Sequence, residues 1–230
     1  MRTLLFFALP REAAAFLMLQ TAELVAIRQE SVPAEIGNAR RYQMGTNEVW
    51  VTGMGAVNAD RVGRVGLEKF RPERVITAGV AGALDPAHQI GDVFHDLDPG
   101  LEIESLLRSA GSRPGRILLS DRIAVTQAEK AALRASTGAD LVEMESAVLR
   151  ELAKAKGIPS ATIRSVSDAA TGDLPLDFNQ FLNVDRQLNP WKLGLGILGR
   201  PSSIPALIAL GRQTSLATNR LATVLHAVIQ

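Results

Sequence analysis

Short apolar runs rich in β-branched residues alternate along this chain with longer segments in which apolar residues recur at helical spacing. The short runs predict strands over residues 3–9, 48–53, 74–79, 117–119, 141–144 and 160–166. The long segments predict helices over 56–70 and 146–156, and Gly157 and Pro159 end the second helix. Such alternation is typical of a mainly parallel sheet covered by helices.

Two further strands are predicted over 23–30 and 91–96. Turn residues rather than crossover helices flank them, so both are expected to run antiparallel and to make the sheet mixed. No internal repeat or low-complexity linker divides the chain, and 230 residues suit one core. The prediction is a single-domain, three-layer α/β/α fold with a central mixed sheet. Residues 1–188 are expected to form the main domain, and 189–230 a C-terminal helical extension packed on the same domain.

Charge and cysteine content exclude several classes of function. The net charge is +1 and no run of Lys and Arg occurs, so no nucleic-acid partner is expected. The absence of cysteine excludes disulfides and thiolate nucleophiles and fits a reducing compartment, so a cytoplasmic location is predicted. The apolar run 4–9 is interrupted by Pro10, Arg11 and Glu12, which indicates a buried strand rather than a signal peptide.

Neither a metal nor a cofactor is predicted. His88, His95 and His226 are isolated from one another in the sequence, so they offer no zinc-binding pattern. The turn that begins at Gly53 resembles a dinucleotide-binding loop, but its third glycine is replaced by Asn58 and no acidic residue follows at a suitable distance. A tight turn between a strand and a helix is the favoured interpretation.

The C-terminal tail, residues 191–230, differs in composition from the rest of the chain. Its charged residues are all basic, namely Lys192, Arg200, Arg212 and Arg220, and it contains helix-like stretches over 204–212 and 215–229. Helices packed on the domain are the favoured interpretation, because most amphipathic stretches face a core. The other interpretation is an apolar, basic surface that makes weak contact with a membrane or with a lipid-like substrate.

Acidic residues follow three of the predicted strands, at the edge where ligands bind in open α/β sheets. Glu145 follows the strand over 141–144, Asp168 follows the strand over 160–166, and Glu12 follows the first strand. Each has a structural alternative, since Glu12 suits a helix start and Ser167 or Asp168 could cap a helix. For Glu143 the start of the next helix is the favoured role. Only the three strand ends taken together predict a site.

Four strings in this sequence occur in the order found in one family. They are VEMESA at 142–147, RSVSD at 164–168, AGVAGA at 78–83 and IGDV at 90–93. Over about residues 1–185 the chain resembles the nucleoside phosphorylase superfamily, and within it the nucleosidase branch typified by methylthioadenosine/S-adenosylhomocysteine nucleosidase. Residues 121–130, Gly138, Ala139 and the long tail are more similar to the hopanoid-associated branch, whose proposed substrate is a nucleoside bearing a large lipid.

This resemblance implies an enzyme that cleaves the bond between a purine base and ribose. Glu145, with Met144 beside it, would bind the ribose hydroxyls, Asp168 would protonate the departing base, and Glu12 would orient or deprotonate the attacking water. Arg164 and Ser167 would support these groups. The implied remaining contacts to substrate are Val80, Ala81, Gly82, Met54, Phe178, Ile123 and Ala124. A homodimer is also implied, because family members complete their sites with a neighbouring subunit.

Water is the favoured nucleophile, although phosphorylases belong to the same superfamily. The loop over 9–12 has no glycine and carries a carboxylate that would repel phosphate, and Thr77 stands where phosphorylases of the family carry an arginine. Val80 replaces a common serine and residues 120–124 lack the aromatic residue that stacks on the base, so adenine does not follow from the sequence. The alternatives are a phosphate-dependent phosphorylase and a non-catalytic nucleoside or lipid-nucleoside binding protein.

Overall fold

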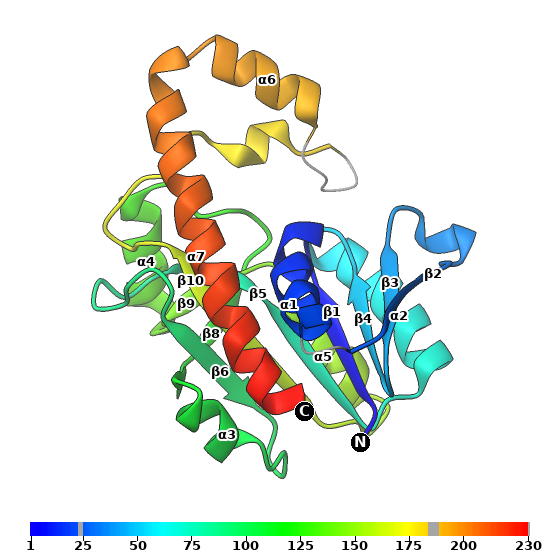
Figure 1. Ribbon diagram of the computed structural model, residues 1–230. Helices are drawn as coiled ribbons and strands as arrows, with labels where there is room; N and C mark the ends of the chain where they lie inside the picture. Colours follow the sequence, from blue (N-terminus) through cyan, green and yellow to red (C-terminus); the bar gives the residue numbers. More distant parts are fainter. Residues whose placement is uncertain (23–24, 184–188, 230) are drawn as a thin grey trace.

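A computed structural model describes residues 1–22, 25–183 and 189–229, and Figure 1 shows a sheet with helices on both faces. The strands of these ranges form one mixed sheet with the main order β2-β3-β4-β1-β5-β10-β6-β7, while β9 pairs with β5 and β8. They are β1 (Thr3–Phe7), β2 (Ile27–Glu30), β3 (Arg40–Met44), β4 (Asn47–Val51), β5 (Arg74–Ala83), β6 (Val93–Leu97), β7 (Ser112–Pro114), β8 (Ile117–Leu119), β9 (Leu141–Glu143) and β10 (Ser160–Asp168). The predicted three-layer fold is confirmed.

The centre of the sheet is parallel and its margins are not. β1 pairs in parallel with β4 and β5, and β5 pairs in parallel with β10. β2 runs antiparallel to β3 and β6 runs antiparallel to β10, as predicted for the segments 23–30 and 91–96. The first of these strands is shorter than predicted, and residues 23 and 24 lie outside the described residues.

The direction of β9 differs from the prediction, which grouped it with the parallel strands. β9 runs antiparallel to β5 through two residue pairs, Gly82 with Val142 and Ala83 with Leu141, and runs parallel to β8. A strand of three residues has no periodicity that indicates its direction, so its partners decide it.

Helices cover both faces of the sheet and bury its apolar side chains. On the near face in Figure 1 lie α1 (Pro10–Ala22), α3 (Glu104–Ser109) and the lower part of α7 (Ile204–Ile229). Their buried core includes Phe16, Leu107 and Leu221. The opposite face carries α2 (Ala56–Phe70) and α5 (Ser146–Lys154), whose core includes Val62 and Leu149. Burial of this apolar area stabilises the sheet on both faces.

The best-predicted elements are α2 and α5. The structure confirms α2 over 56–70, and α5 begins at Ser146 as predicted but ends at Lys154. The two helices pack closely at Gly63, where a Cβ atom would lie 2.7 Å from Leu149 and 2.9 Å from Leu152. A glycine at this position therefore lets α5 approach α2.

The C-terminal helices differ from the prediction. The stretches 204–212 and 215–229 form the single helix α7, because neither glycine nor proline follows Gly211 before Ile229. The sequence analysis also did not identify α4 (Gln127–Thr137) or α6 (Pro190–Leu198). Three short 3₁₀ helices complete the described elements, η1 (Ala34–Ile36), η2 (Phe178–Phe181) and η3 (Pro201–Ser203).

The upper part of α7 and all of α6 project beyond the carboxyl edge of the central strands (Figure 1). We call α6, η3 and residues 204–216 the arm. Within the described residues, no single helix has both the length and the apolar character needed to cross a membrane. The segments Trp191–Leu198 and Pro201–Ile229 meet these criteria only as a pair bent by 101°.

Candidate active site

A cavity of about 200 Å³ lies where β1, β5, β9 and β10 end. Its wall contains most of the predicted site residues, namely Glu12, Met54, Val80, Ala81, Gly82, Ile123, Ala124, Met144, Glu145, Ser167 and Asp168. It also contains residues that the sequence analysis did not assign to substrate contact, namely Ala8, Leu9, Arg122, Val142, Glu143 and Leu174. Three acidic residues that are far apart in the chain therefore face one space.

Glu12 lies in the first turn of α1 and is buried. Its Oε1 accepts a hydrogen bond from the N–H of Val80 at 2.9 Å, and its Oε2 accepts one from the N–H of Leu9 at 2.8 Å. A Cβ atom at Gly79 would lie 3.0 Å from Oε1, so glycine gives this carboxylate its place beside β5. Burial raises the pKa of Glu12, although backbone N–H groups and Arg164 oppose the rise.

Glu143, in the cavity wall, forms a buried ion pair with Arg164, which lies outside the wall. Arg164 Nη2 lies 2.7 Å from Glu143 Oε2. The same carboxylate accepts the N–H groups of Glu145 and Ser146, and the Ser146 hydroxyl donates to it at 2.8 Å. Glu143 is the last residue of β9, and its carboxylate binds the N–H groups at the start of α5, which is the helix-start role favoured from the sequence. Arg164 is not part of the cavity wall and supports the site through Glu143.

Glu145 occupies the N-cap position of α5 and is buried. Its Oε1 accepts a hydrogen bond from the N–H of Gly55 at 2.6 Å. Burial and, second, the neighbouring Glu143 raise the pKa of Glu145 to about 8, while Gly55 and Arg164 act in the opposite direction. Glu145 therefore holds a proton near neutral pH when the cavity contains no ligand.

The turn at Gly53 and Gly55, which resembles a dinucleotide-binding loop, connects a strand to a helix and contacts the site. Gly53 and Gly55 have φ values of 90° and 85°, which residues with a Cβ atom rarely adopt. This conformation connects β4 to α2 tightly, as the sequence analysis favoured, and it directs the Gly55 N–H toward Glu145. The sequence pattern did not predict that contact, because 90 residues separate the two partners.

Asp168 ends β10 and pairs with a lysine that the sequence analysis did not identify. Lys130 Nζ lies 2.6 Å from Asp168 Oδ2, and it also donates to the carbonyl oxygens of Ala169 and Gly172. Only 1% of the Lys130 side chain is exposed. Ser167 donates its hydroxyl to the other oxygen of Asp168 at 2.9 Å. The carboxylate is thus held from both sides.

The position of Asp168 depends on a β-bulge. The pairing of β10 with β5 shifts between Val166 and Asp168, so Ser167 is the extra residue and Asp168 lies opposite Gly82. A Cβ atom at Gly82 would lie 3.1 Å from Asp168 Oδ2. No helix begins at these residues, so the alternative in which Ser167 or Asp168 caps a helix is wrong.

One sequence signal could have indicated Lys130. Lys130, Leu133 and Thr137 share the spacing i, i+3 and i+7 on α4, and Leu133 packs against a buried cluster. A charged residue at a core-facing position needs a partner of opposite charge. The identity of that partner, 38 residues away, is decided only by the folded structure.

Phe178 is the other predicted site residue that the cavity wall lacks. Phe178 lies in η2, and the next residue of that helix, Asn179, makes the contact with the site instead. The Asn179 side chain accepts the N–H of Ile123 at 2.9 Å and donates to the Ile123 carbonyl at 3.0 Å. The Asp177 side chain accepts the Asn179 N–H and sets the start of η2. Residues 123–124 are thereby held against the cavity.

One cluster outside the cavity has metal-ligand residue types. The ligand atoms of Asp85, His88 and Asp140 lie within 4.8 Å of one another. Both carboxylates already accept hydrogen bonds from Arg134, at 2.6 Å from Asp85 and 2.8 Å from Asp140. The guanidinium supplies the positive charge that a metal ion would bring, so this cluster is an ion-pair network that joins α4 to the end of β5.

Comparison with known proteins gives consistent matches. The profile of the Phosphorylase superfamily matches residues 4–94 and 103–189. A 5'-methylthioadenosine/S-adenosylhomocysteine nucleosidase of Staphylococcus haemolyticus is 28% identical over 177 residues, which cover 62% of this chain and 78% of that protein. An aminodeoxyfutalosine nucleosidase of Campylobacter jejuni is 30% identical over 161 residues, which cover 56% of this chain and 70% of that protein.

Solved structures have the same fold. The 5'-methylthioadenosine/S-adenosylhomocysteine nucleosidase of Helicobacter pylori with butyl-thio-DADMe-Immucillin-A superposes with a TM-score of 0.73 at 16% identity, covering 99% of this chain and 97% of that one. The native futalosine hydrolase of the same organism gives a TM-score of 0.71 at 17% identity, with the same coverage. Both matches extend over nearly the whole chain.

Proposed function

This chain belongs to the phosphorylase superfamily, and from that premise we propose that it is a nucleosidase. It hydrolyses the N-ribosidic bond of a purine nucleoside, of the adenosine type with a 5′ substituent. The observation that carries this proposal is the convergence of Glu12, Glu145 and Asp168 on one cavity, each with different partners. The sequence matches to nucleosidases support it.

Glu145 binds the ribose in this proposal. A protonated carboxyl group can both donate to one hydroxyl and accept from the next, which suits a vicinal diol. Cleavage of the N-ribosidic bond develops positive charge on the sugar, as in glycoside hydrolysis. This positive charge is attracted to the oxygen atoms of the Glu145 carboxyl group, so that group interacts more strongly with the transition state than with the bound substrate.

Asp168 and Lys130 supply the proton for the departing base. In the ion pair, Lys130 carries the proton and its Nζ lies 2.6 Å from Asp168 Oδ2. As the bond breaks, a proton passes from Lys130 through Asp168 to a ring nitrogen of the base, so that Asp168 ends as a carboxylate and Lys130 as a neutral amine. Ser167 holds the other carboxylate oxygen and so fixes the orientation of Asp168 during the transfer.

Glu12 completes the reaction on the other side of the sugar. Its raised pKa brings this carboxylate closer to the proton affinity that a general base needs at neutral pH. It accepts a proton from the attacking water, whose oxygen bonds to the anomeric carbon. Exchange with solvent then returns that proton to Lys130. The products are the free purine and a ribose derivative.

Two features of the cavity favour water over phosphate. Arg122 is the single cationic side chain in the cavity wall within the described residues, and it pairs with Glu129 at 2.8 Å. Thr77 is fully buried and hydrogen-bonds to Thr162 at 3.1 Å, so it does not face an anion. A phosphate in this cavity would meet carboxylates without a free arginine.

The proposal is tested by incubating the protein with adenosine, inosine or methylthioadenosine in phosphate-free buffer. Chromatography then measures the free base that is released. Asp168→Asn should lower the rate by roughly 10²–10⁴ because the proton relay is broken. Asp60→Asn, in an exposed pair with Arg64 on α2, is the matched control and should retain full activity. A strict requirement for phosphate would indicate a phosphorylase, and binding of nucleosides without any base release would indicate a binding protein.

The homodimer and the cytoplasmic location remain predictions that belong to this proposal. Sedimentation equilibrium of the purified chain measures the first. Cell fractionation with an antibody to the chain measures the second.

A further inference from the structure

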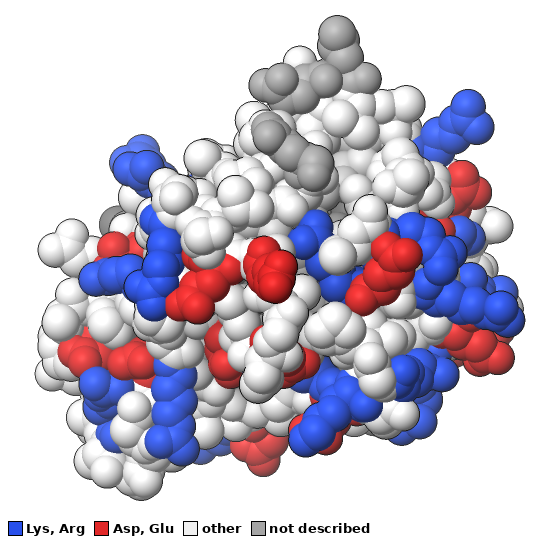
Figure 2. Space-filling view, turned by 90° about the horizontal axis from the view of Figure 1, so that it is seen from below, with Lys and Arg blue, Asp and Glu red and all other residues white. Residues whose placement is uncertain are grey.

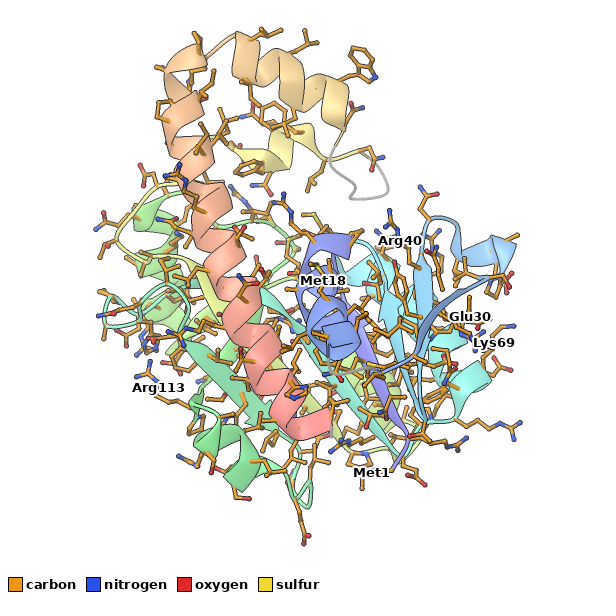
Figure 3. All side chains as sticks on the ribbon, viewed as in Figure 1. Met1, Met18, Glu30, Arg40, Lys69 and Arg113 are labelled. Carbon is orange, nitrogen blue, oxygen red and sulfur yellow. The ribbon has the colours of Figure 1, made fainter. Side chains whose placement is uncertain are left out.

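The arm exposes a large share of the apolar surface of this molecule. Among the described residues, ten large hydrophobic side chains are exposed, and six of them lie on the arm. These six are Trp191, Leu195, Leu198, Ile204, Ile208 and Leu216. Figure 3 shows that the arm stands apart from the sheet. An exposed apolar patch of this kind marks an interaction surface.

The exposed side chains of α6 form one stripe. Trp191, Leu195 and Leu198 are spaced i, i+4 and i+7, which places them on a single face of the helix. The other face packs on η2, because a Cβ atom at Gly196 would lie only 2.5 Å from the ring of Phe181. Trp191 is 84% exposed. Among the residues that the structure describes, none covers this apolar stripe.

Exposed apolar side chains also occur on the first part of α7. Ile204 and Ile208 lie one turn apart on the same side of the helix, whereas Leu216, eight residues further on, is turned by about 80° around the helix axis. α6 and α7 meet at a bend of 101°. Two apolar helix faces joined by a sharp bend can lie along a surface but do not form a straight span.

The charges of the arm have one sign. Lys192, Arg200 and Arg212 flank the apolar side chains, and no Asp or Glu occurs anywhere from residue 189 to residue 230. The rest of the molecule is different, since Figure 2, a view from below, shows acidic and basic side chains intermixed over that face. The chain as a whole has a net charge of only +1, so the basic character belongs to this region.

We propose that the arm docks onto a membrane surface that carries anionic lipids. The apolar stripe enters the boundary between headgroups and acyl chains, and the three basic residues bind lipid phosphates. A second copy of the chain fits this surface less well, because a two-fold interface built from the arm would bring like charges together. The proposal rests on the arm alone and does not depend on the nucleosidase assignment.

Tryptophan fluorescence of the full chain gives a direct test. The chain has two tryptophans: Trp50 is fully buried and hydrogen-bonded to Glu48, whereas Trp191 is exposed on the stripe. Vesicles containing phosphatidylglycerol should shift the emission to shorter wavelength and should sediment with the protein, and pure phosphatidylcholine vesicles should do neither. In Trp191→Phe the shift should be lost while cosedimentation is retained.

Two sets of substitutions separate the charge from the apolar contact. K192Q/R200Q/R212Q should weaken vesicle binding on the order of a hundredfold, about fivefold for each basic residue. R40Q/K69Q/R113Q removes the same charge from exposed positions on the rest of the molecule, labelled in Figure 3, and should leave binding unchanged. L195S/L198S should also abolish binding, whereas Met18→Ser, at an exposed position on α1, should not.

Three outcomes would overturn the proposal. The first is equal binding to neutral and anionic vesicles, and the second is no binding to either. The third is equal weakening by the arm and control charge substitutions. If sedimentation instead shows a dimer that L195S/L198S dissociates, the stripe belongs to a second copy of the chain. Base release from soluble nucleosides needs no vesicles, so its failure would refute the proposed enzyme and not the docking surface.

Discussion

Replacement of Glu145 by glutamine tests the electrostatics of the cavity most directly. Burial beside Glu143 raises the pKa of Glu145 from its ordinary value of 4.5 to about 8. Between these values the folded protein keeps a proton that the unfolded chain has lost, so the free energy of unfolding falls as the pH rises. At about 1.36 kcal/mol for each pKa unit, the loss across this window is at most about 5 kcal/mol.

Glutamine is neutral at every pH and retains an oxygen that can accept the Gly55 N–H. We therefore expect Glu145→Gln to match the wild type within about 1 kcal/mol at pH 5, and to exceed its stability by several kcal/mol at pH 9. Urea unfolding at pH 5, 7 and 9 measures this difference, with the slope against urea concentration expected to stay constant. Glu151→Gln, at an exposed position on the same helix, is the control and should show no such divergence.

A stability difference between Glu145→Gln and the wild type that does not change with pH would refute the reasoning. It would mean that Glu145 ionises in the folded protein much as it does in the unfolded chain. A wild type that gains stability between pH 5 and 8, relative to the glutamine variant, would contradict even the sign of the effect.

Three other predictions address the proton relay and the ribose site. Lys130→Met should lower the free energy of unfolding by about 3–5 kcal/mol, because it leaves the Asp168 carboxylate without its cation. In a double-mutant cycle, adding Asp168→Asn to this variant should recover part of that loss. Gly82→Ala should slow base release on the order of a hundredfold by displacing Asp168, with the urea midpoint nearly unchanged; an unaltered rate would show that this position is not critical. A nucleoside analogue with a cationic nitrogen in the sugar ring should bind more tightly by calorimetry as the pH rises through about 8, where Glu145 ionises, whereas a neutral analogue should not follow this trend.

Much of the fold could be predicted because its signals are local. The bounds of α2 follow from apolar periodicity, and β1 and β10 follow from short apolar runs that are buried along their length. The three strand ends that carry Glu12, Glu145 and Asp168 were likewise visible, since an acidic residue after an apolar strand is a sequence pattern. β1 and β10 both run parallel to β5 and end at one edge of the sheet, so the convergence of Glu12 and Asp168 also follows. Glu145 follows a strand that runs antiparallel to β5, so its place beside them depends on the pairing of β9 with the end of β5.

The errors in prediction have one local cause and two long-range causes. The helix break expected near 213 is absent, because no residue there prevents α7 from continuing. The direction of β9 depends on two residue pairs with β5. The β-bulge at Ser167 is a property of two paired strands and cannot be recognised in one of them.

The sequence by itself determined the layers of this protein, the order of its main strands and helices, and the acidic residues that follow three of the strands. Periodicity and residue type act over one or two turns of chain, so they carry this information without a partner. The tertiary structure alone decided that Lys130 pairs with Asp168, that Gly55 contacts Glu145 and that Arg164 neutralises Glu143. Each of these contacts joins residues far apart in the chain. Each also involves a buried side chain, and a charge or a polar group removed from water destabilises the fold unless it has a partner.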